Sequence, residues 1–348
     1  MAAHLVKRMV GLCVGDSLSF PGWKLLLPML LLGALLIFFS ISHKDRFLLP
    51  IREEQPDKAC VQGEAGRKAA EIIGNYSQDE PVFLRLKDYF WSKKPSMYQL
   101  PYGTKGSENL LLQALALINS ALPESLQSLK CHRCVVVGSG NRLIDSHLGD
   151  AIDEYDVVLR LNNAPVYGYE RDVGSKTTMR LFYPESAFFH PRENNADTLL
   201  VLVPFKAADF QWVTITLADK KRVYRGFWKR PPIIWKSNPE YVRILNPFFM
   251  SMTATRLLGL PNKPSQKVRQ GGKPTTGLVA ITLALHLCDM VHIAGFGYPD
   301  TSNKNQSIHY YEKVMLKAMR PSGHNISQEA LAIKRLLDIK AIKNLTYF

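Results

Sequence analysis

The sequence predicts an α/β fold, in which helices flank a single, mainly parallel sheet, with one further transmembrane helix near the N-terminus. Residues 135–137 form a short apolar run that leads directly into the turn Gly138-Ser139-Gly140. A run without polar residues is typical of a strand buried on both faces, as in a parallel sheet. Apolar runs of this kind alternate along the chain with segments of helical pattern, and this alternation favours a parallel sheet covered by helices.

The order of these elements can be followed along the chain. Further strands are expected at residues 156–161, 198–203, 242–245 and 291–294. Helices are expected at residues 109–122, from the segment 273–277 through residue 287, and at residues 330–339. The second of these helices is apolar nearly all round, so we expect it to be buried. The last is expected to begin at a cap formed by Asn325 or Ser327.

An uncharged, largely apolar segment at residues 25–42 predicts a membrane anchor. A membrane-spanning helix needs ~20 apolar residues, with ~17 as the lower limit. The tail before it is basic, which predicts a cytosolic N-terminus. A cleaved signal peptide is the alternative, but the leading region is long and no Ala-x-Ala site follows. We expect a cytoplasmic tail (1–24), a transmembrane signal-anchor (25–42), a luminal stem (43–81) and a globular domain (82–348).

The cysteines and sequons agree with a luminal, oxidising location. Four cysteines beyond the membrane segment allow three pairings: Cys60, Cys131, Cys134 and Cys288. The spacing Cys131-x-x-Cys134 also occurs in zinc sites, but here no second cysteine pair and no His-x-x-x-His sequence accompanies it. We therefore predict no metal site. Four Asn-x-Ser/Thr sequons are candidates for N-glycosylation: Asn75, Asn305, Asn325 and Asn344.

The formal net charge of +14 raises the question of an anionic partner. Nucleic-acid binding is disfavoured because the basic residues are dispersed and form no stripe interleaved with aromatic residues. A basic field of this kind favours small anionic substrates.

Candidate site residues gather at the ends of the predicted strands and at two helix starts. Gly138-Ser139-Gly140 and Asn162 follow neighbouring strands, and ligands of open α/β sheets bind at the carboxyl ends of strands. Such a turn brings backbone N–H groups close to a phosphate, although an ordinary tight turn has the same pattern. The segment Thr275-Thr276-Gly277 opens a helix, whose N-terminus can cap itself or bind an anion.

Two histidines near the C-terminus complete this set. His324 directly precedes a helix N-terminus, whose partial positive charge lowers the pKa of a histidine and keeps the ring neutral. A neutral imidazole is the form that a general base requires. His309 lies in His309-Tyr-Tyr-Glu312, after the second glycine turn, Gly295-Phe-Gly297. The chain has no Asp-x-Asp sequence, the usual metal-binding pair of nucleotide-sugar transferases.

Four of these stretches resemble the motifs of the animal sialyltransferases, glycosyltransferase family 29. Residues 134–185 resemble the large sialyl motif and residues 274–297 the small motif, while His309-Tyr-Tyr-Glu312 resembles the third motif. His324-Asn-Ile-Ser-Gln-Glu329 resembles the very small motif. The motifs occur in the family's order, and the similarity extends over most of the chain beyond the membrane segment. Residues 75–77, 89–91, 100–108 and 243–249 look most like the β-galactoside α2,3-sialyltransferases.

The resemblance implies a GT-A-like variant with a single Rossmann-type sheet, in a type II membrane enzyme of the Golgi. It implies inverting, metal-independent transfer of sialic acid from CMP-sialic acid to the 3-hydroxyl of a terminal galactose on glycoproteins and glycolipids. The expected acceptor is Galβ1,4GlcNAc. No cofactor is implied. A short span also suits the thinner membranes of the early secretory pathway.

The resemblance also assigns roles to residues. His324 would be the general base, and His309 would contact the donor phosphate. The implied donor-binding residues are Ser139, Gly140, Asn141, Asn162, Tyr183, Thr275, Thr276, Gly277 and Gly297. A disulfide between the large and small motifs would join Cys134 to Cys288, which leaves Cys60 to pair with Cys131. Family members usually carry Asn at the position of Ser139, and serine lacks the second arm of the amide.

Two other functions are compatible with these residues. The chain could be a transferase that uses a different nucleotide sugar, or a membrane-anchored galactose-binding lectin with the same fold. A nicotinamide dehydrogenase is disfavoured, because the third glycine and the acidic ribose ligand of the dinucleotide fingerprint are not evident.

Overall fold

The computed structural model describes residues 60–90, 96–188, 190–220, 225–261, 272–297, 306–317 and 323–346. The chain divides into two units, Met1–Ala59 and Cys60–Phe348, and all described residues belong to the second. The predicted tail, the predicted membrane segment and the sequon Asn305 therefore lie outside the described residues. Within the described residues, no helix has the length and apolar character that a membrane crossing requires.

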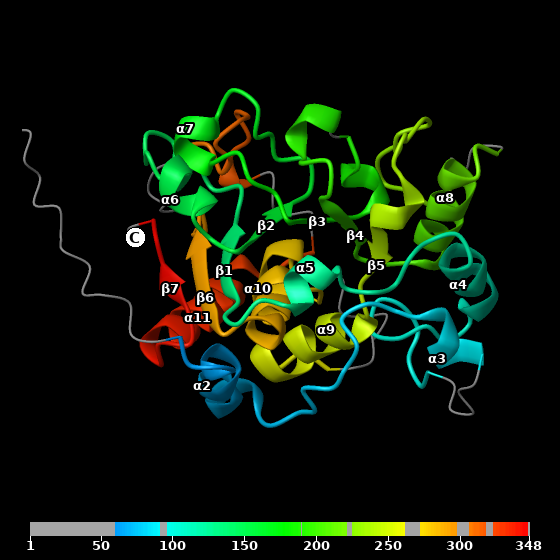
Figure 1. Ribbon diagram of the computed structural model, residues 1–348, viewed down its shortest axis with the longest axis horizontal. Coiled ribbons are helices and arrows are strands. Elements are labelled where there is room, and N and C mark those ends of the chain that lie inside the picture. Colours follow the sequence, from blue (N-terminus) through cyan, green and yellow to red (C-terminus); the bar gives the residue numbers. More distant parts are fainter. Residues whose placement is uncertain are drawn as a thin grey trace, which may run out of the picture. The chain divides into compact units, whose positions relative to one another are not determined.

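The described residues form one seven-stranded sheet, in which every neighbouring pair of strands is parallel (Figure 1). This confirms the predicted α/β class. The strands are β1 (Arg133–Val137), β2 (Val157–Leu161), β3 (Met179–Phe182), β4 (Leu199–Leu202), β5 (Val242–Ile244), β6 (Met290–Ala294) and β7 (Lys343–Asn344). All five strands expected from the apolar runs are present.

The order of the strands is β5-β4-β3-β2-β1-β6-β7. The chain therefore starts near the centre, winds outward from β1 to β5, and then returns to the other side of β1 with β6 and β7. The direction of winding reverses between β1 and β6. In open α/β sheets, the crevice at the carboxyl ends of the strands beside such a reversal is the usual ligand site.

Helices connect the strands and cover both faces of the sheet. They are α2 (Glu64–Ile73), α3 (Leu86–Phe90), α4 (Glu108–Leu115), α5 (Glu124–Gln127), α6 (Gly149–Asp153), α7 (Glu170–Val173), α8 (Ala207–Leu217), α9 (Pro247–Met252), α10 (Thr276–Leu287) and α11 (Ile326–Asp338). A π-helical segment, η5 (Thr253–Leu257), continues α9. Helix α4 is shorter than the predicted 109–122, because the chain turns at residue 116 and leads into α5.

The two faces follow from the alternation of side chains along each strand. In β1, Cys134 and Val136 pack into the core formed with α2, α9, α10 and α11. The intervening Val135 and Val137 pack against α6 and α7. Helices α4 and α8 cover the β4–β5 end of that second face. Figure 1 shows α6 and α7 on one side of the sheet and α2, α9 and α10 on the other. Helix α10 is buried along most of its length, as its apolar sequence predicted.

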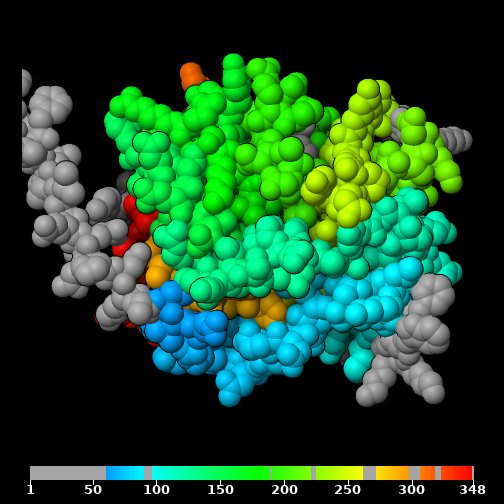
Figure 2. Space-filling view, in the orientation of Figure 1, coloured from blue at the N-terminus to red at the C-terminus, as the bar shows by residue number. Residues whose placement is uncertain are grey.

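The folded unit begins earlier than the sequence suggested. The prediction placed the end of the stem at residue 81, but the compact unit starts at Cys60. Helix α2 is amphipathic, and Ala65, Ala69 and Ile73 recur at four-residue spacing on the face that packs into the core. The other residues of α2 are mostly polar and partly or fully exposed, so the segment appears polar when its residues are considered together. Figure 2 shows α2 and the segment that follows it lying against the rest of the folded unit.

Two disulfides join segments that are far apart in the sequence. Cys134, the second residue of β1, pairs with Cys288, which follows α10. Cys60 pairs with Cys131, just before β1. Both implied pairings are therefore confirmed. Together they fix α2 and the C-terminal end of α10 to the start of the central strand.

Candidate active site

The glycine turn after β1 and the segment that carries His309 lie side by side. The amide of Asn141 donates to the carbonyl of Ile308 at 3.1 Å, and the amide of Tyr310 donates to the carbonyl of Ser139 at 3.1 Å. These two bonds form an antiparallel bridge between Gly140 and His309. The structure thus brings together residues that are some 170 positions apart in sequence and were predicted to share a site.

The turn differs in one respect from the prediction that its backbone N–H groups face a phosphate. The amides of Gly138 and Gly140 donate to the carbonyls of Ala294 and Gly295, at 2.7 and 2.9 Å. These hydrogen bonds, and that of Asn141, are made within the protein. The glycines are needed for close packing, since a Cβ on Gly138 would lie 2.5 Å from the carbonyl oxygen of Gly295. The amides of Gly138, Gly140 and Asn141 are therefore already paired within the protein.

His309 is held at the edge of this turn by two neighbours. Its Nδ1 lies 2.5 Å from Oε1 of Glu312. Its ring stacks on Tyr311 with centroids 5.3 Å apart and planes within 3°. In the same segment, the side-chain amide of Gln306 donates to Oδ1 of Asn141 at 2.9 Å. The imidazole is therefore oriented by a carboxylate and by an aromatic face.

Asn162, after β2, adopts a left-handed backbone conformation with φ of 53°. Arg180 of β3 holds it there, because the guanidinium donates to the carbonyls of Asn162 and Ala164, both at 3.0 Å. The same guanidinium donates to the carbonyl of Glu193 and to Oδ1 of Asn194. Burial lowers the pKa of Arg180 to about 10, so the side chain remains charged at neutral pH. A buried cation thus fixes the loop at the end of β2.

The start of α10 lies between the ends of β2 and β6. Thr275 caps the helix, and its Oγ1 accepts from the amide of Leu278 at 3.2 Å, which confirms the predicted self-capping. A Cβ on Gly277 would lie 3.1 Å from Phe296 and 3.4 Å from Leu161. These two side chains immediately precede Gly297 and Asn162. Gly277 therefore lies close to the ends of the two strand segments that precede Asn162 and Gly297.

Two further residues that were predicted to bind the donor are Thr276, which is buried, and Tyr183, which is partly buried. Thr276 is buried, so a ligand at this helix N-terminus would meet its backbone N–H more readily than its hydroxyl. Tyr183 follows β3 and packs edge-on against Phe205. Burial, and then the nearby Glu185, raises the pKa of the Tyr183 phenol to about 12. This phenol is therefore a hydrogen-bonding group at neutral pH and does not ionise.

His324 is positioned by the loop that leads into α10. Its Nδ1 lies 2.8 Å from the carbonyl oxygen of Lys273. A carbonyl can only accept, so Nδ1 carries the proton and Nε2 of the neutral ring carries the lone pair. The pKa of His324 is lowered chiefly by burial and further by the charge of Lys273, against the opposing effect of this hydrogen bond. Asn325 then caps α11 by accepting from Gln328 at 3.1 Å, as predicted.

Glu329 in α11 joins the same two segments a second time. Its carboxylate accepts from the amide of Thr275 at 2.8 Å and from the Thr275 hydroxyl at 2.6 Å. Burial raises the pKa of Glu329 to about 7, although both hydrogen bonds act in the opposite direction. The N-terminal turn of α11 is thus attached to the loop before α10 at two points, Lys273 and Thr275.

Sequence reasoning missed Arg180, the Lys273 carbonyl and the structural role of Glu329. Arg180 and Glu329 both lie inside stretches that were recognised as motifs. A charged residue in an otherwise apolar strand, or on the inner face of a helix, is a signal that could have identified them. The role of the Lys273 carbonyl could not have been predicted, because every residue has a backbone carbonyl group and the residue type gives no information about it.

The sequons also differ in structural setting. Asn75 is exposed. The side-chain nitrogen of Asn344, to which a glycan would be attached, is buried. Asn325 uses its side-chain oxygen to cap α11. A glycan on Asn344 is therefore incompatible with this fold.

Comparison with known proteins agrees with this geometry. Residues 83–341 match the model of glycosyltransferase family 29 (sialyltransferase). The chain therefore belongs to this family, and it is a sialyltransferase.

Two similar proteins from different species have the same name, and each aligns over nearly its whole length. The chain is 64% identical over 328 residues to CMP-N-acetylneuraminate-beta-galactosamide-alpha-2,3-sialyltransferase 4 of Pan troglodytes, covering 94% of this chain and 99% of the relative. It is 63% identical to the protein of the same name from Homo sapiens, covering 94% and 98%.

Solved structures show the same architecture. A crystal structure of a mammalian sialyltransferase matches with a TM-score of 0.64 at 26% identity, covering 84% of this chain and 100% of that one. A mammalian sialyltransferase in complex with Gal-beta-1-3GalNAc-ortho-nitrophenol matches with a TM-score of 0.61, also at 26% identity, covering 78% and 93%. The parallel sheet flanked by helices is therefore shared with these enzymes.

Proposed function

We propose that this chain transfers sialic acid from CMP-sialic acid to the 3-hydroxyl of a terminal β-linked galactose, with Galβ1,4GlcNAc on glycoproteins and glycolipids as the main acceptor. The chain is a β-galactoside α2,3-sialyltransferase. The observation that carries this proposal is the setting of His324: a neutral imidazole, with its proton fixed on Nδ1, held against the loop that begins α10.

In the proposed reaction, Nε2 of His324 takes the proton of the galactose 3-hydroxyl. The oxygen forms a bond to the anomeric carbon of sialic acid while the bond from that carbon to the phosphate oxygen breaks. CMP leaves with the electron pair, and the single displacement inverts the configuration. A positioned general base typically contributes ~10²–10⁴-fold to such a rate.

Negative charge that develops on the leaving phosphate must be stabilised. The N-terminus of α10 supports this role. The amide of Leu278 is used by the Thr275 cap, but the amides of Thr276 and Gly277 have no carbonyl partner within the helix, and the helix dipole favours an anion there. His309 is the second candidate: its proposed role is to donate a hydrogen bond to the phosphate, with Glu312 orienting the ring. The side chains of Ser139, Asn141 and Asn162 are proposed to contact the nucleotide.

We propose that no metal ion takes part. The chain lacks an Asp-x-Asp sequence. Among the described residues, one cluster has the spacing of a metal site, Cys60, Cys131 and Asp289. The two cysteines are joined in a disulfide and cannot act as thiolate ligands. Undiminished activity after removal of divalent cations by a chelator is the expected result, and restoration of a lost activity by added metal would contradict it.

The proposed setting is the Golgi membrane. Residues 25–42 would anchor the chain as a single-pass type II protein, with residues 1–24 in the cytosol. The catalytic unit would then be luminal, which the two disulfides support, because disulfides persist in oxidising compartments. We also propose that the single sheet is a variant of the GT-A-like fold.

Transfer assays test this function directly. The full chain is incubated with CMP-sialic acid and a panel of galactosides, and the linkage is read by a 2,3-specific sialidase. We expect CMP release and a product that this sialidase cleaves. A nucleotide sugar other than CMP-sialic acid as the preferred donor, or galactoside binding without CMP release, would instead support the alternative transferase or the lectin.

Substitution of His324 tests the proposed base. His324→Ala is expected to lower kcat by ~10²-fold or more while CMP binding is retained, because the base acts on the acceptor. A folded His324→Ala variant with near-normal turnover would overturn the assignment.

A further inference from the structure

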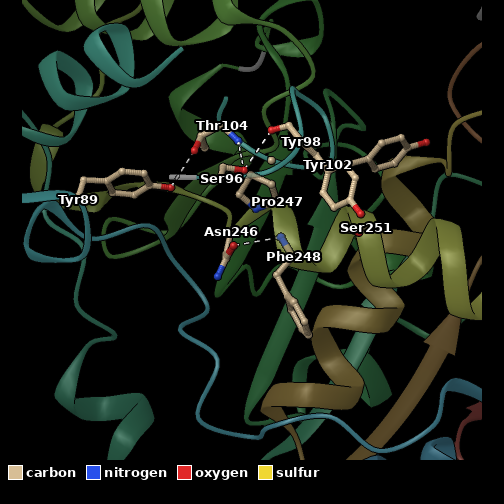
Figure 3. A pocket seen from close by; sticks show the side chains of 10 residues that line it. Tyr89, Ser96, Tyr98, Tyr102, Thr104, Asn246, Pro247, Phe248 and Ser251 are labelled. Carbon is tan, nitrogen blue, oxygen red and sulfur yellow. Dashed lines mark hydrogen bonds between the residues drawn. The ribbon is translucent and has the colours of Figure 1, made fainter. Parts of the chain in front are cut away.

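A pocket of about 290 Å³ lies beyond the end of β5, next to the loop that leads to α10 (Figure 3). This volume is near the lower end of the ~300–1,000 Å³ that is typical of small-ligand sites. Its walls come from the segment before α4 and from the start of α9. The lining residues are Tyr89, Ser96, Tyr98, Tyr102, Gly103, Thr104, Asn246, Pro247, Phe248 and Ser251.

The lining is aromatic and polar but uncharged. None of these described residues carries a charge, in a chain whose net charge is +14. CMP-sialic acid carries a phosphate and a carboxylate, so a pocket whose described lining residues are all uncharged is a poor site for the donor. Aromatic faces combined with hydroxyl groups suit a neutral molecule that has both C–H and O–H surfaces. A sugar ring is such a molecule.

Several polar groups of the pocket are already fixed by hydrogen bonds. Ser96 accepts from the amide of Thr104 at 3.0 Å and donates to the carbonyl of Tyr98. The hydroxyls of Thr104 and Tyr89 are 3.3 Å apart (Figure 3). The hydroxyl groups of Tyr98 and Ser251 make no hydrogen bond to any described residue. These two groups are therefore available to a ligand.

One wall of the pocket and the proposed base are bound to the same short segment of backbone. The hydroxyl of Tyr102 donates to the carbonyl of Gly272 at 2.8 Å. The next carbonyl along the chain, that of Lys273, accepts from His324 Nδ1 at 2.8 Å. Consecutive Cα atoms are ~3.8 Å apart, so one wall of the pocket and the base contact adjacent peptide groups. Tyr102, which lines the pocket, and His324 are therefore close neighbours in the fold.

We infer that this pocket binds the second sugar of the acceptor, the ring to which the terminal galactose is linked. This inference rests on the proposed function, in which the galactose lies at His324. The pocket would select the acceptor through aromatic contact with that ring and through hydrogen bonds from Tyr98 and Ser251. It would therefore distinguish disaccharide acceptors from isolated galactosides.

The test compares two acceptors with the full chain and CMP-sialic acid: N-acetyllactosamine, and methyl β-galactoside, which has no second sugar. Two variants probe the pocket. Tyr98→Ala removes a ring and a hydroxyl, and Ser251→Phe fills the space. The matched control is Met97→Ala, which changes a neighbouring side chain that is 79% exposed and does not line the pocket. Thermal unfolding verifies that each variant is folded.

We expect both pocket variants to raise KM for N-acetyllactosamine by about 3- to 10-fold, the range of one aromatic contact. The KM values for methyl β-galactoside and CMP-sialic acid should stay within about twofold, a change of less than ~0.5 kcal/mol. Equal losses on both acceptors in folded variants, or no loss on either, would overturn the inference. Absence of transfer by the unmodified chain to any galactoside would instead refute the proposed function.

Discussion

The buried carboxyl group of Glu329 makes the stability of this protein depend on pH in a direction opposite to that of most carboxylates. Glu329 lies in α11 and accepts two hydrogen bonds from Thr275. Despite these bonds, burial raises its pKa to about 7. The substitution Glu329→Gln keeps the shape of the side chain and removes its titration, so comparison of the two proteins isolates this group.

The magnitude follows from linkage. The pKa rises from an ordinary value of 4.5 to about 7, and a tenfold change in acidity corresponds to ~1.4 kcal/mol, which gives about 3 kcal/mol. Because the folded-state pKa is the higher one, the folded protein binds more protons than the unfolded chain between these two values. The contribution to stability is therefore fully present below pH 4.5 and is lost as the pH rises through about 7.

The assay measures the free energy of unfolding of the unmodified protein and of Glu329→Gln by denaturant titration. Measurements run from about pH 4.5 to about pH 7.5, the window that the two pKa values define. The stability of the unmodified protein relative to the variant should fall by about 3 kcal/mol across this range. The control is Glu124→Gln, which removes an exposed carboxylate at the start of α5. The corresponding difference for this control should stay nearly constant.

Two results would refute this reasoning. A stability difference that does not vary with pH would mean that Glu329 has no raised pKa in the folded protein. A difference that grows in favour of the unmodified protein as the pH rises would mean that the hydrogen bonds from Thr275 outweigh burial.

Three further predictions concern the donor site and its support. His309→Ala should raise KM for CMP-sialic acid by roughly tenfold or more, the value of a hydrogen bond to a charged group, and initial rates at varied donor and acceptor concentrations should show an unchanged KM for the acceptor. Arg180→Lys should destabilise the fold by about 3 kcal/mol, because lysine cannot satisfy the four acceptors around the buried guanidinium; thermal unfolding measures the loss, and unchanged stability would contradict the role assigned to Arg180. Replacing Cys134 and Cys288 together by alanine should cost about 2–5 kcal/mol, since their disulfide closes a loop between residues 154 positions apart; a transition midpoint that does not move would contradict this estimate.

The main features of the sheet could be predicted because its strands are buried on both faces. Residues 135–137 and 291–294 are largely apolar, and in a chain with alternating helices such runs are typical of buried parallel strands. The amphipathic helix α2 was missed because it has only a few buried positions, Ala65, Ala69 and Ile73 among them. A pattern of small apolar residues at four-residue spacing is weak against a polar background.

The side chains of the candidate site could be predicted from the sequence, but most of its backbone hydrogen bonds could not. The residue types of His324 and Thr275 indicate what these side chains can do chemically. The hydrogen bonds that Gly138 and Gly140 donate to the end of β6 and the turn after it cannot be predicted from residue type, because they depend on how closely two distant loops pack. For the same reason the sequence could not show that His324 is oriented by a carbonyl group.

The disulfide pattern has a consequence for synthesis of the chain. Each of the two disulfides has one cysteine in the short segment 131–134, Cys131 in one case and Cys134 in the other. During synthesis, Cys288 is added to the chain 154 residues after its partner Cys134. At ~5–20 residues per second, that delay is roughly 8–30 s, and disulfides form in seconds to hours. Cys60 can meet either partner during this time. Correct maturation therefore depends on keeping the Cys134 thiol reduced, or on reshuffling, until α10 and the residue that follows it have emerged.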